Sequence, residues 1–233
     1  MFKWIFKWLF RLALLAVLLV VGFLLSLDSI LRISIEHNIR AQTGMDAEIG
    51  RVEVGWTEPT FEIQDLKIYN PPSFGGTPFL DVPEIHIEYD RMALLRSELH
   101  LTLLRLNLAE LDIVRNRDGN INVFSLGQPP KKNSGIVVPS FKKETGYDFE
   151  GIDALNVSFN KVKYIDLQNS RNNREDTVGL QNCVVPDVKS ARDLAGLAVI
   201  IDLRSNHFFE PLVSQQFQSA PLKSVLNLMG AAL

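Results

Sequence analysis

The chain opens with a long apolar stretch and later changes to a pattern in which apolar and polar residues alternate. Leu12–Leu27 contains sixteen residues without a charge. A helix needs about 20 apolar residues to cross the hydrocarbon core of a bilayer, so this stretch alone is slightly short. Three cations spaced four apart precede it and share one helical stripe, from which their stems can reach the headgroups. With the interfacial Trp4 and Trp8, the pattern predicts a membrane span over about Trp8–Leu27.

The predicted anchor consists of its flanking cations and its large apolar side chains. They are Lys3, Lys7, Arg11, Leu12, Leu14, Leu15, Val17, Leu18, Leu19, Val20, Val21, Phe23, Leu24, Leu25 and Leu27. Residues 1–27 contain no acid, so the positive-inside rule predicts a cytoplasmic N-terminus with the bulk of the chain across the membrane. A cleaved signal peptide is the alternative, but no A-x-A pattern closes the run. A soluble core helix would keep a polar face, which this run lacks.

The segment after the anchor has the pattern of an amphipathic helix. Asp28 and Ser29 are good N-cap residues, and Gly44 suits the position after a helix end. Between them, Leu31, Ile35 and Ile39 form an apolar stripe. The pattern predicts a helix over 28–43 that packs on the start of a sheet or lies near the membrane surface.

From Ala47 the apolar period becomes two, which predicts β-strands. Two segments change parity. Within Thr60–Asn70, a bulge near Gln64–Asp65 would keep one face apolar. Within Glu98–Arg115, the change predicts a bulge, a bend or two strands joined near Asn107–Ala109. The remaining predicted strands cover 49–54, 83–90, 121–126, 152–158, 161–167, 177–184 and 197–203, and further helices are predicted over 186–195 and 221–232.

These elements predict a mainly β, α+β fold: an anchor and an amphipathic helix, then a twisted, curved antiparallel sheet of about eight to ten strands, whose curvature would allow a groove. Turns at short spacing and the absence of a βαβ rhythm favour antiparallel pairing. A Gly-, Pro-, Ser- and Lys-rich stretch at 127–143 predicts a loop. We therefore divide the chain into the anchor (1–27), a helix and sheet (28–126), this loop, and a continuation of the sheet with a C-terminal helix (144–233).

Composition narrows the possible functions. Without the three anchor cations, 21 basic and 27 acidic side chains give a net charge of −6, so nothing indicates a nucleic-acid partner. Cys183 is the single cysteine, which excludes an intramolecular disulfide and CxxC-type metal sites. His86 and His100 lie on predicted polar strand faces, and a metal site would need a further donor. The sequence predicts no catalytic residue, metal site or cofactor, and therefore no enzyme.

Several segments, in this order, resemble the N-terminal region of AsmA-like proteins. After the anchor come IEHNIRAQTGMDAEIGRVEV (35–54), FEIQDLKIYNPPSFGGTPFLDVPEIHIEYD (61–90) and ALLRSELHLTLLRLNLAELDIVRNRDGNINV (93–123). The distinctive points are a strand ending in Asn70–Pro71 and the later Asp118–Gly119 followed by Asn122. The resemblance covers about residues 1–126. It implies a single-pass protein of the bacterial inner membrane, mostly periplasmic, whose curved sheet takes part in envelope lipid homeostasis.

The apolar strand faces allow two interpretations that the sequence leaves open. They could be an ordinary core beneath a helix or a second sheet, or they could line an open groove for acyl chains. The candidate lipid-facing residues are Phe61, Ile63, Ile85, Ile87, Tyr89, Leu99 and Leu101. On the groove interpretation the protein binds or passes membrane lipids. The alternative is a non-catalytic assembly component that contacts envelope proteins or a second copy of itself, with 221–232 as the contact.

Overall fold

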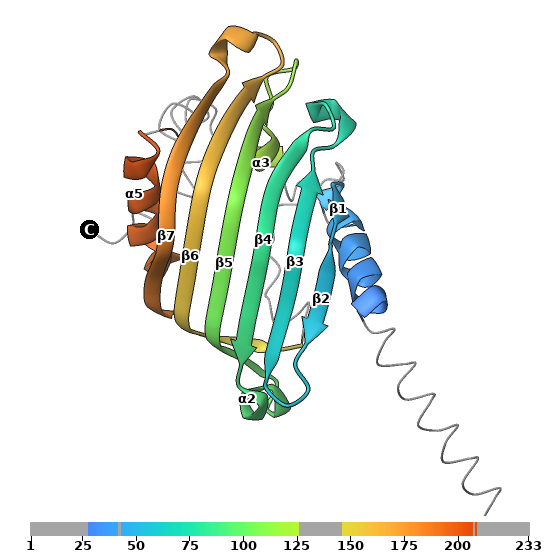
Figure 1. Ribbon diagram of the computed structural model, residues 1–233, viewed down its shortest axis with the longest axis vertical. Helices are drawn as coiled ribbons and strands as arrows, with labels where there is room; N and C mark the ends of the chain where they lie inside the picture. Colours follow the sequence, from blue (N-terminus) through green and yellow to red (C-terminus); the bar gives the residue numbers. More distant parts are fainter. Residues whose placement is uncertain (1–27, 42, 126–145, 207, 209–233) are drawn as a thin grey trace, which may run out of the picture.

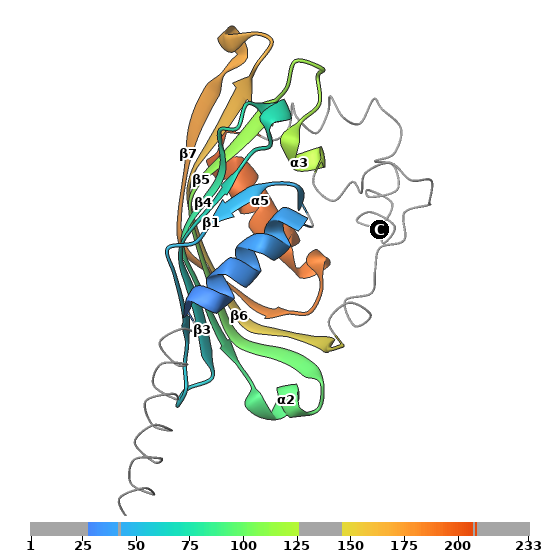
Figure 2. The ribbon, with the colours of Figure 1, turned by 90° about the vertical axis from the view of Figure 1, so that its right-hand side faces the viewer.

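The strands of the computed structural model form one curved sheet (Figures 1 and 2). The structure describes residues 28–41, 43–125, 146–206 and 208. Its strands are β1 (Asp46–Glu48), β2 (Arg51–Val54), β3 (Thr60–Tyr69), β4 (Pro78–Tyr89), β5 (Glu98–Arg115), β6 (Asp148–Asp166) and β7 (Arg174–Val188). Besides a helix over residues 28–41, the helices are α2 (Arg91–Leu95), α3 (Asn122–Ser125) and α5 (Ala195–Arg204), with short 3₁₀ turns η1 (Pro72–Phe74), η2 (Ser170–Asn172) and η3 (Ala191–Leu194).

The sheet runs in the order β1-β3-β4-β5-β6-β7, and β2 pairs with the other half of β3. The mainly β prediction is confirmed, but the sheet is mixed. Strands β5 and β6 are parallel along nearly their whole length, whereas the other pairs are antiparallel. Parallel pairing requires the chain to return to the starting end of β5 before β6 begins. The turn-based prediction of uniformly antiparallel strands is therefore wrong at this one pair.

Two of the predicted strands are wrong in other ways. The segment 197–203 belongs to helix α5, because Leu194, Leu197 and Ile201 pack at helical spacing against the sheet. Upstream, Ser190 and Asp193 form a reciprocal capping box that starts the η3 turn. The predicted strand at 121–126 reduces to a single bridge between Arg115 and Ile121, after which the chain turns into α3.

Some of the open alternatives are now resolved. Segment 98–115 is one strand of 18 residues, and the two strands predicted at 152–158 and 161–167 are one strand of 19 residues. The predicted amphipathic helix exists and packs on the sheet. Two of its carboxylates hold main-chain N–H groups at the sheet edge: Asp28 accepts from Val52 at 2.7 Å and Glu36 from Ile49 at 2.9 Å.

The alternation of apolar residues reverses half-way along five neighbouring strands. In each strand, residues an odd number of positions apart belong to the same packed cluster: Ile63 and Leu66, Val82 and Ile85, Leu108 and Leu111, Phe159 and Val162, Leu180 and Cys183. Asp65, with φ of 54°, and Asn182, with φ of 47°, lie at two of the reversals. The change of alternation predicted at Gln64–Asp65 is thus present, as one part of a row that crosses the sheet. It is not a bulge, because the register between β3 and β4 does not shift there; Asp65 instead adopts a left-handed backbone conformation. Reversal keeps the apolar side chains on the concave face from one strand end to the other.

The described helices other than α2 lie on this concave side of the sheet (Figure 2). The helix over 28–41 covers β2, β3 and β4 through its apolar stripe, and α5 covers β6 and β7. Among the described residues, no helix is long and apolar enough to cross a membrane. The predicted anchor and the predicted helix 221–232 lie outside the described residues.

A buried amide network joins the upper ends of β3, β4 and β5. The Asn122 side chain, fully buried, donates to Asn70 Oδ1 at 2.8 Å and to the Asp112 carbonyl at 2.9 Å, and accepts from the main-chain N–H groups of Val114 and Val123. Asn70 in turn donates to the Pro78 carbonyl at 3.1 Å. Asn70 and Asn122 are two of the distinctive positions of the family resemblance, and the structure places them in direct contact.

Replacing Asn122 with alanine should destabilise the fold strongly. The change leaves the Val114 N–H, the Asp112 carbonyl and Asn70 Oδ1 without their partner, and each buried unsatisfied group costs about 1–3 kcal/mol. We expect a loss of about 3 kcal/mol or more in the free energy of unfolding, measured by denaturant titration of the detergent-solubilised chain. Asn120→Ala, two residues away at an exposed position, serves as the control and should change it by less than about 0.5 kcal/mol. Equal effects of the two substitutions would contradict this account.

Candidate functional site

The seven candidate lipid-facing residues lie on one face of the sheet. The register pairs Phe61 with Ile87, Ile63 with Ile85 and Tyr89 with Leu101. Directly paired residues point to the same face of a sheet, and Leu99 shares the face of Leu101 two positions away. This face is the concave one, because Ile63 packs in the cluster that includes the helix over 28–41. The structure therefore brings all seven residues together.

These residues differ in how they are packed. Ile63 is a core residue beneath the helix over 28–41, and Phe61 and Ile85 pack against the same cluster. Ile87, Tyr89 and Leu99 are half-buried and belong to neither of the two apolar clusters of the described residues. We call these three, together with the buried Leu101, the concave strip: Ile87, Tyr89, Leu99 and Leu101. The strip lies where β4 ends and β5 begins, next to α2.

The second apolar cluster occupies the other flank of the concave face. It joins β5, β6 and β7 to α5, with Val162 fully buried and Phe159 and Leu180 nearly so. The two helices thus cover the two sides of the concave face. The strip remains outside both covered regions.

The convex face is polar and carries ion pairs across the strands. His86 lies 3.3 Å from Glu62 and 3.4 Å from Glu88, and Arg105 lies 3.4 Å from Glu84. His86 directly precedes Ile87, so the two faces of β4 differ sharply in polarity at adjacent positions. The placement of the histidines on the polar face is as the alternation predicts.

His100 lies on the same polar face and contacts a carboxylate. Its Nε2 lies 2.8 Å from Asp153 Oδ1, and this hydrogen bond raises the pKa of His100. Within the described residues, no group of three or more histidine, cysteine or acidic side chains is arranged to hold a metal ion. The two histidines therefore serve as partners of carboxylates on a solvated face.

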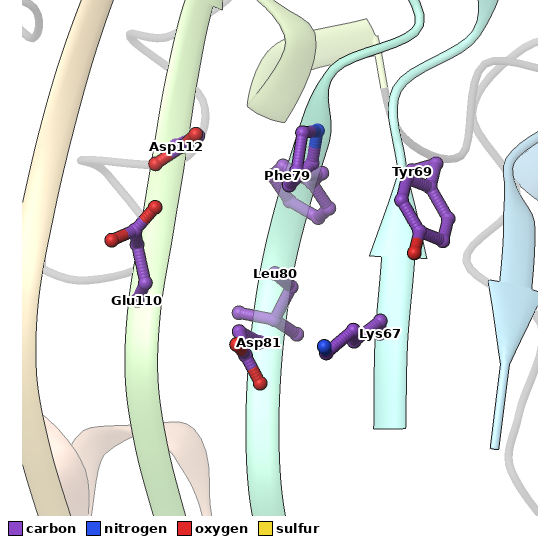
Figure 3. A pocket seen from close by; sticks show the side chains of 8 residues that line it. Lys67, Tyr69, Phe79, Leu80, Asp81, Glu110 and Asp112 are labelled. Carbon is purple, nitrogen blue, oxygen red and sulfur yellow. The ribbon is translucent and has the colours of Figure 1, made fainter. Parts of the chain in front are cut away.

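A small hollow of about 180 Å³ on this polar side was not foreseen from the sequence (Figure 3). Its lining comes from β3, β4 and β5: Lys67, Tyr69, Pro78, Phe79, Leu80, Asp81, Glu110 and Asp112. Asp112 is only 4% exposed, and its Oδ1 atom has no hydrogen-bond partner. Burial, reinforced by the negative charge of Glu110, raises the pKa of Asp112 to about 6.

Glu110 behaves in the opposite way to its neighbour. Burial alone would raise the pKa of Glu110, but hydrogen bonds from Lys163 at 2.6 Å and from Lys161, 3.1 Å away, lower it overall. Below about pH 6, a protonated Asp112 therefore lies beside the more acidic Glu110 in the lining of this hollow. The sequence signal was available: after the parity change in β5, Glu110 and Asp112 alternate with Leu111 and Ile113.

The raised pKa of Asp112 predicts a specific dependence of stability on pH. Because the folded chain holds this proton more tightly, its contribution to stability is complete below the ordinary pKa of 3.8 and is lost as the pH rises through about 6. The corresponding free energy is on the order of 3 kcal/mol. Asp112→Asn should therefore stabilise the chain by about 1–3 kcal/mol at pH 8 and much less at pH 4, measured by denaturant titration at each pH.

The exposed Asp118 provides the control for this experiment. Asp118→Asn should leave the free energy of unfolding within about 0.5 kcal/mol at both pH values, as expected for a surface substitution. A stabilisation by Asp112→Asn that is the same at pH 4 and pH 8 would show that the carboxyl does not titrate in this range.

Comparison with known proteins agrees with the resemblance in the sequence. The family model described as "AsmA family" matches residues 2–188, which includes every strand of the sheet. Neither the search of curated proteins nor the search of solved structures found a match. Membership of this family is consistent with a lipid-related function associated with the cell envelope. Because the family model covers most of the sequence, the chain belongs to the AsmA family.

Proposed function

We propose that this protein binds the acyl chains of membrane lipids on the concave face of its sheet, at the bacterial inner membrane. Residues 1–27 would anchor it with the N-terminus in the cytoplasm, and the sheet would lie in the periplasm. The observation that carries the proposal is the concave strip, whose apolar side chains belong to neither packed cluster although they continue the apolar face. Binding would be non-covalent and would need no cofactor.

The chemistry of the strip suits hydrocarbon better than a headgroup. Ile87, Leu99 and Leu101 offer no polar atoms, and Tyr89 offers a single hydroxyl. Each methylene moved from water onto such a surface contributes about 0.8 kcal/mol, so even partial contact along an acyl chain stabilises the complex. Affinity would then depend on the length of the acyl chain more than on the identity of the headgroup.

The size of the sheet limits the role. Adjacent strands are about 4.8 Å apart, so the six positions from β1 to β7 span about 24 Å, less than the roughly 30 Å of one bilayer core. One copy of this sheet is therefore too short to connect two membranes. We propose that it receives or holds lipid at the inner membrane, and that any passage between membranes requires further copies or partners.

Site-specific photocrosslinking tests the proposal with two adjacent residues. A photoreactive amino acid at Ile87 faces the concave strip, whereas the same group at His86 faces the polar convex side. In the full chain extracted from membranes, we expect phospholipid to crosslink at position 87 several-fold more than at position 86, as the opposite faces of a strand require.

Two results would overturn the proposal. One is equal lipid crosslinking at both positions, which would indicate nonspecific contact with membrane or detergent. The other is a protein crosslinked at position 87 without lipid, which would favour the alternative of an assembly component.

A further inference from the structure

Three large apolar side chains are exposed together at the end of the sheet where α2 lies. Leu95 is 80% exposed, Trp56 64% and Met92 62%. Trp56 lies in the turn from β2 to β3, and Met92 and Leu95 lie in α2, which connects β4 to β5 (Figure 1). The two turns are linked, because Arg91 donates a hydrogen bond to the Trp56 carbonyl at 3.1 Å. We call these three residues the apolar rim.

Two of the large apolar residues of the short helix α2, Met92 and Leu95, are exposed. Asp90 caps it by accepting hydrogen bonds from the N–H groups of Met92 and Ala93. Ala93 is fully buried, and Met92 and Leu95, three apart, share the opposite, exposed face. On its inner side, α2 packs through the fully buried Ala93 and the half-buried Leu94. The two large side chains do not contribute to the described core, so their exposure calls for another partner.

The chain arrives at the sheet from the direction of this rim. In the helix over 28–41, the carboxylate of Glu36 accepts a hydrogen bond from the main-chain N–H of Ile49, and that of Asp28 accepts one from Val52. The helix is therefore antiparallel to the segment from Ile49 to Val52. Its N-terminal end, at Asp28, points toward the end of β2 from which the chain continues to Trp56. The sixteen-residue apolar stretch Leu12–Leu27 ends immediately before Asp28. Trp56 lies four residues beyond Val52, so the rim extends about 13 Å or less past the point where that stretch ends.

We propose that the apolar rim is inserted into the surface of the lipid bilayer, at the boundary between headgroups and acyl chains. This inference rests on the proposed function, because it uses the anchor at 1–27. Tryptophan prefers this boundary, and methionine and leucine can enter the outer hydrocarbon layer. The concave strip lies directly above, since Tyr89 is the last residue of β4 before the α2 cap. Insertion would place the strip at the point where lipid leaves the bilayer.

The ion pairs near the rim reduce the attraction that anionic lipid would exert on it, so we expect apolar insertion to be the driving force. Arg96 lies 2.7 Å from Glu98 and Arg51 lies 2.7 Å from Glu53, while Arg91 is engaged with the Trp56 carbonyl. Arg96 and Arg51 are therefore balanced by neighbouring carboxylates, while Arg91 keeps its charge and is oriented by the turn. A bilayer of zwitterionic phosphatidylcholine should be sufficient.

Quenching of tryptophan fluorescence tests the insertion directly. The chain has three tryptophans, so Trp4→Phe with Trp8→Phe leaves Trp56 as the only tryptophan, which is excited selectively over the tyrosines at about 295 nm. This full chain is reconstituted into phosphatidylcholine vesicles, with or without lipid brominated near the top of its acyl chains. We expect brominated lipid to reduce Trp56 emission by about half, as for an interfacial tryptophan.

Matched variants establish that the rim is responsible. In the same background, Met92→Gln with Leu95→Gln should reduce this quenching at least twofold. Val199→Gln with Leu203→Gln on α5, where both residues are similarly exposed (58% and 59%), should leave it unchanged. Thermal unfolding is measured for each variant to show that the sheet is intact.

Each outcome separates this inference from the proposed function. Trp56 emission that brominated lipid does not quench overturns the rim, and emission that is blue-shifted but unquenched indicates that a protein surface covers it instead. Equal quenching in both double variants also overturns it. If position 87 still crosslinks to lipid while Trp56 is unquenched, only the proposed insertion of the rim is wrong. If Trp56 is quenched and position 87 captures no lipid, only the proposed binding of acyl chains on the concave face is wrong.

Discussion

The structure depends on the reversal of apolar alternation that crosses the sheet half-way along its strands. Regular alternation would move the apolar side chains of a long strand to the other face wherever their spacing becomes odd. Here the spacing becomes odd half-way along β3 to β7, and the pairing of β6 with β7 also shifts register there, near Phe159. Each strand reverses its alternation of apolar and polar residues at this point. Ile63 and Leu66, for example, therefore both face the concave side although they are three residues apart. A mismatch in one strand would place charged residues beneath the helices, where an unpaired charge costs several kcal/mol. The concave face is therefore apolar over its full length and can serve as one surface.

The second requirement is that the strand ends hold their positions although the concave strip belongs to neither apolar cluster of the described residues. The Asn70–Asn122 contact meets it at one end, since four hydrogen bonds from one buried amide fix the turn after β3 and the end of β5. At the sheet edge, Asp28 and Glu36 occupy main-chain N–H groups that would otherwise be unpaired. These polar contacts stabilise the frame locally. The concave strip does not need to be packed by a covering helix for the sheet to form.

Much of this fold follows from the sequence, and the failures have physical causes. Alternation predicted β3, β4 and β5, and the odd spacing in Thr60–Asn70 identified the irregularity at Asp65. It could not identify the parallel pairing of β5 and β6, because strand direction depends on where the chain returns and not on the local pattern. The apolar run at 197–203 suits both strand and helix, and tertiary packing decides between them. The register between strands brings the seven candidate residues to one face. Register depends on how the strands pair, which the pattern within one strand does not determine.

The buried carboxyl of Asp112 shows a different limit. Its position on the polar face was predictable, but its exposure was not, because burial at Asp112 depends on Phe79 and Glu110 from two strands meeting around it. Sequence patterns give the face of a residue more readily than its depth. For the same reason the sequence could not distinguish a core residue such as Ile63 from the half-buried Ile87. Ile87 lies on the neighbouring strand, two residues beyond Ile85, the partner of Ile63.

The most direct test of the central claim is an experimental structure of the full chain in a lipid nanodisc prepared from native membranes. We expect elongated density of an acyl chain on the concave face, in contact with Ile87 and Leu99 and open toward the α2 end. Density showing that protein side chains fill this face against the strip, with no lipid present, would contradict it and would make the sheet an ordinary core.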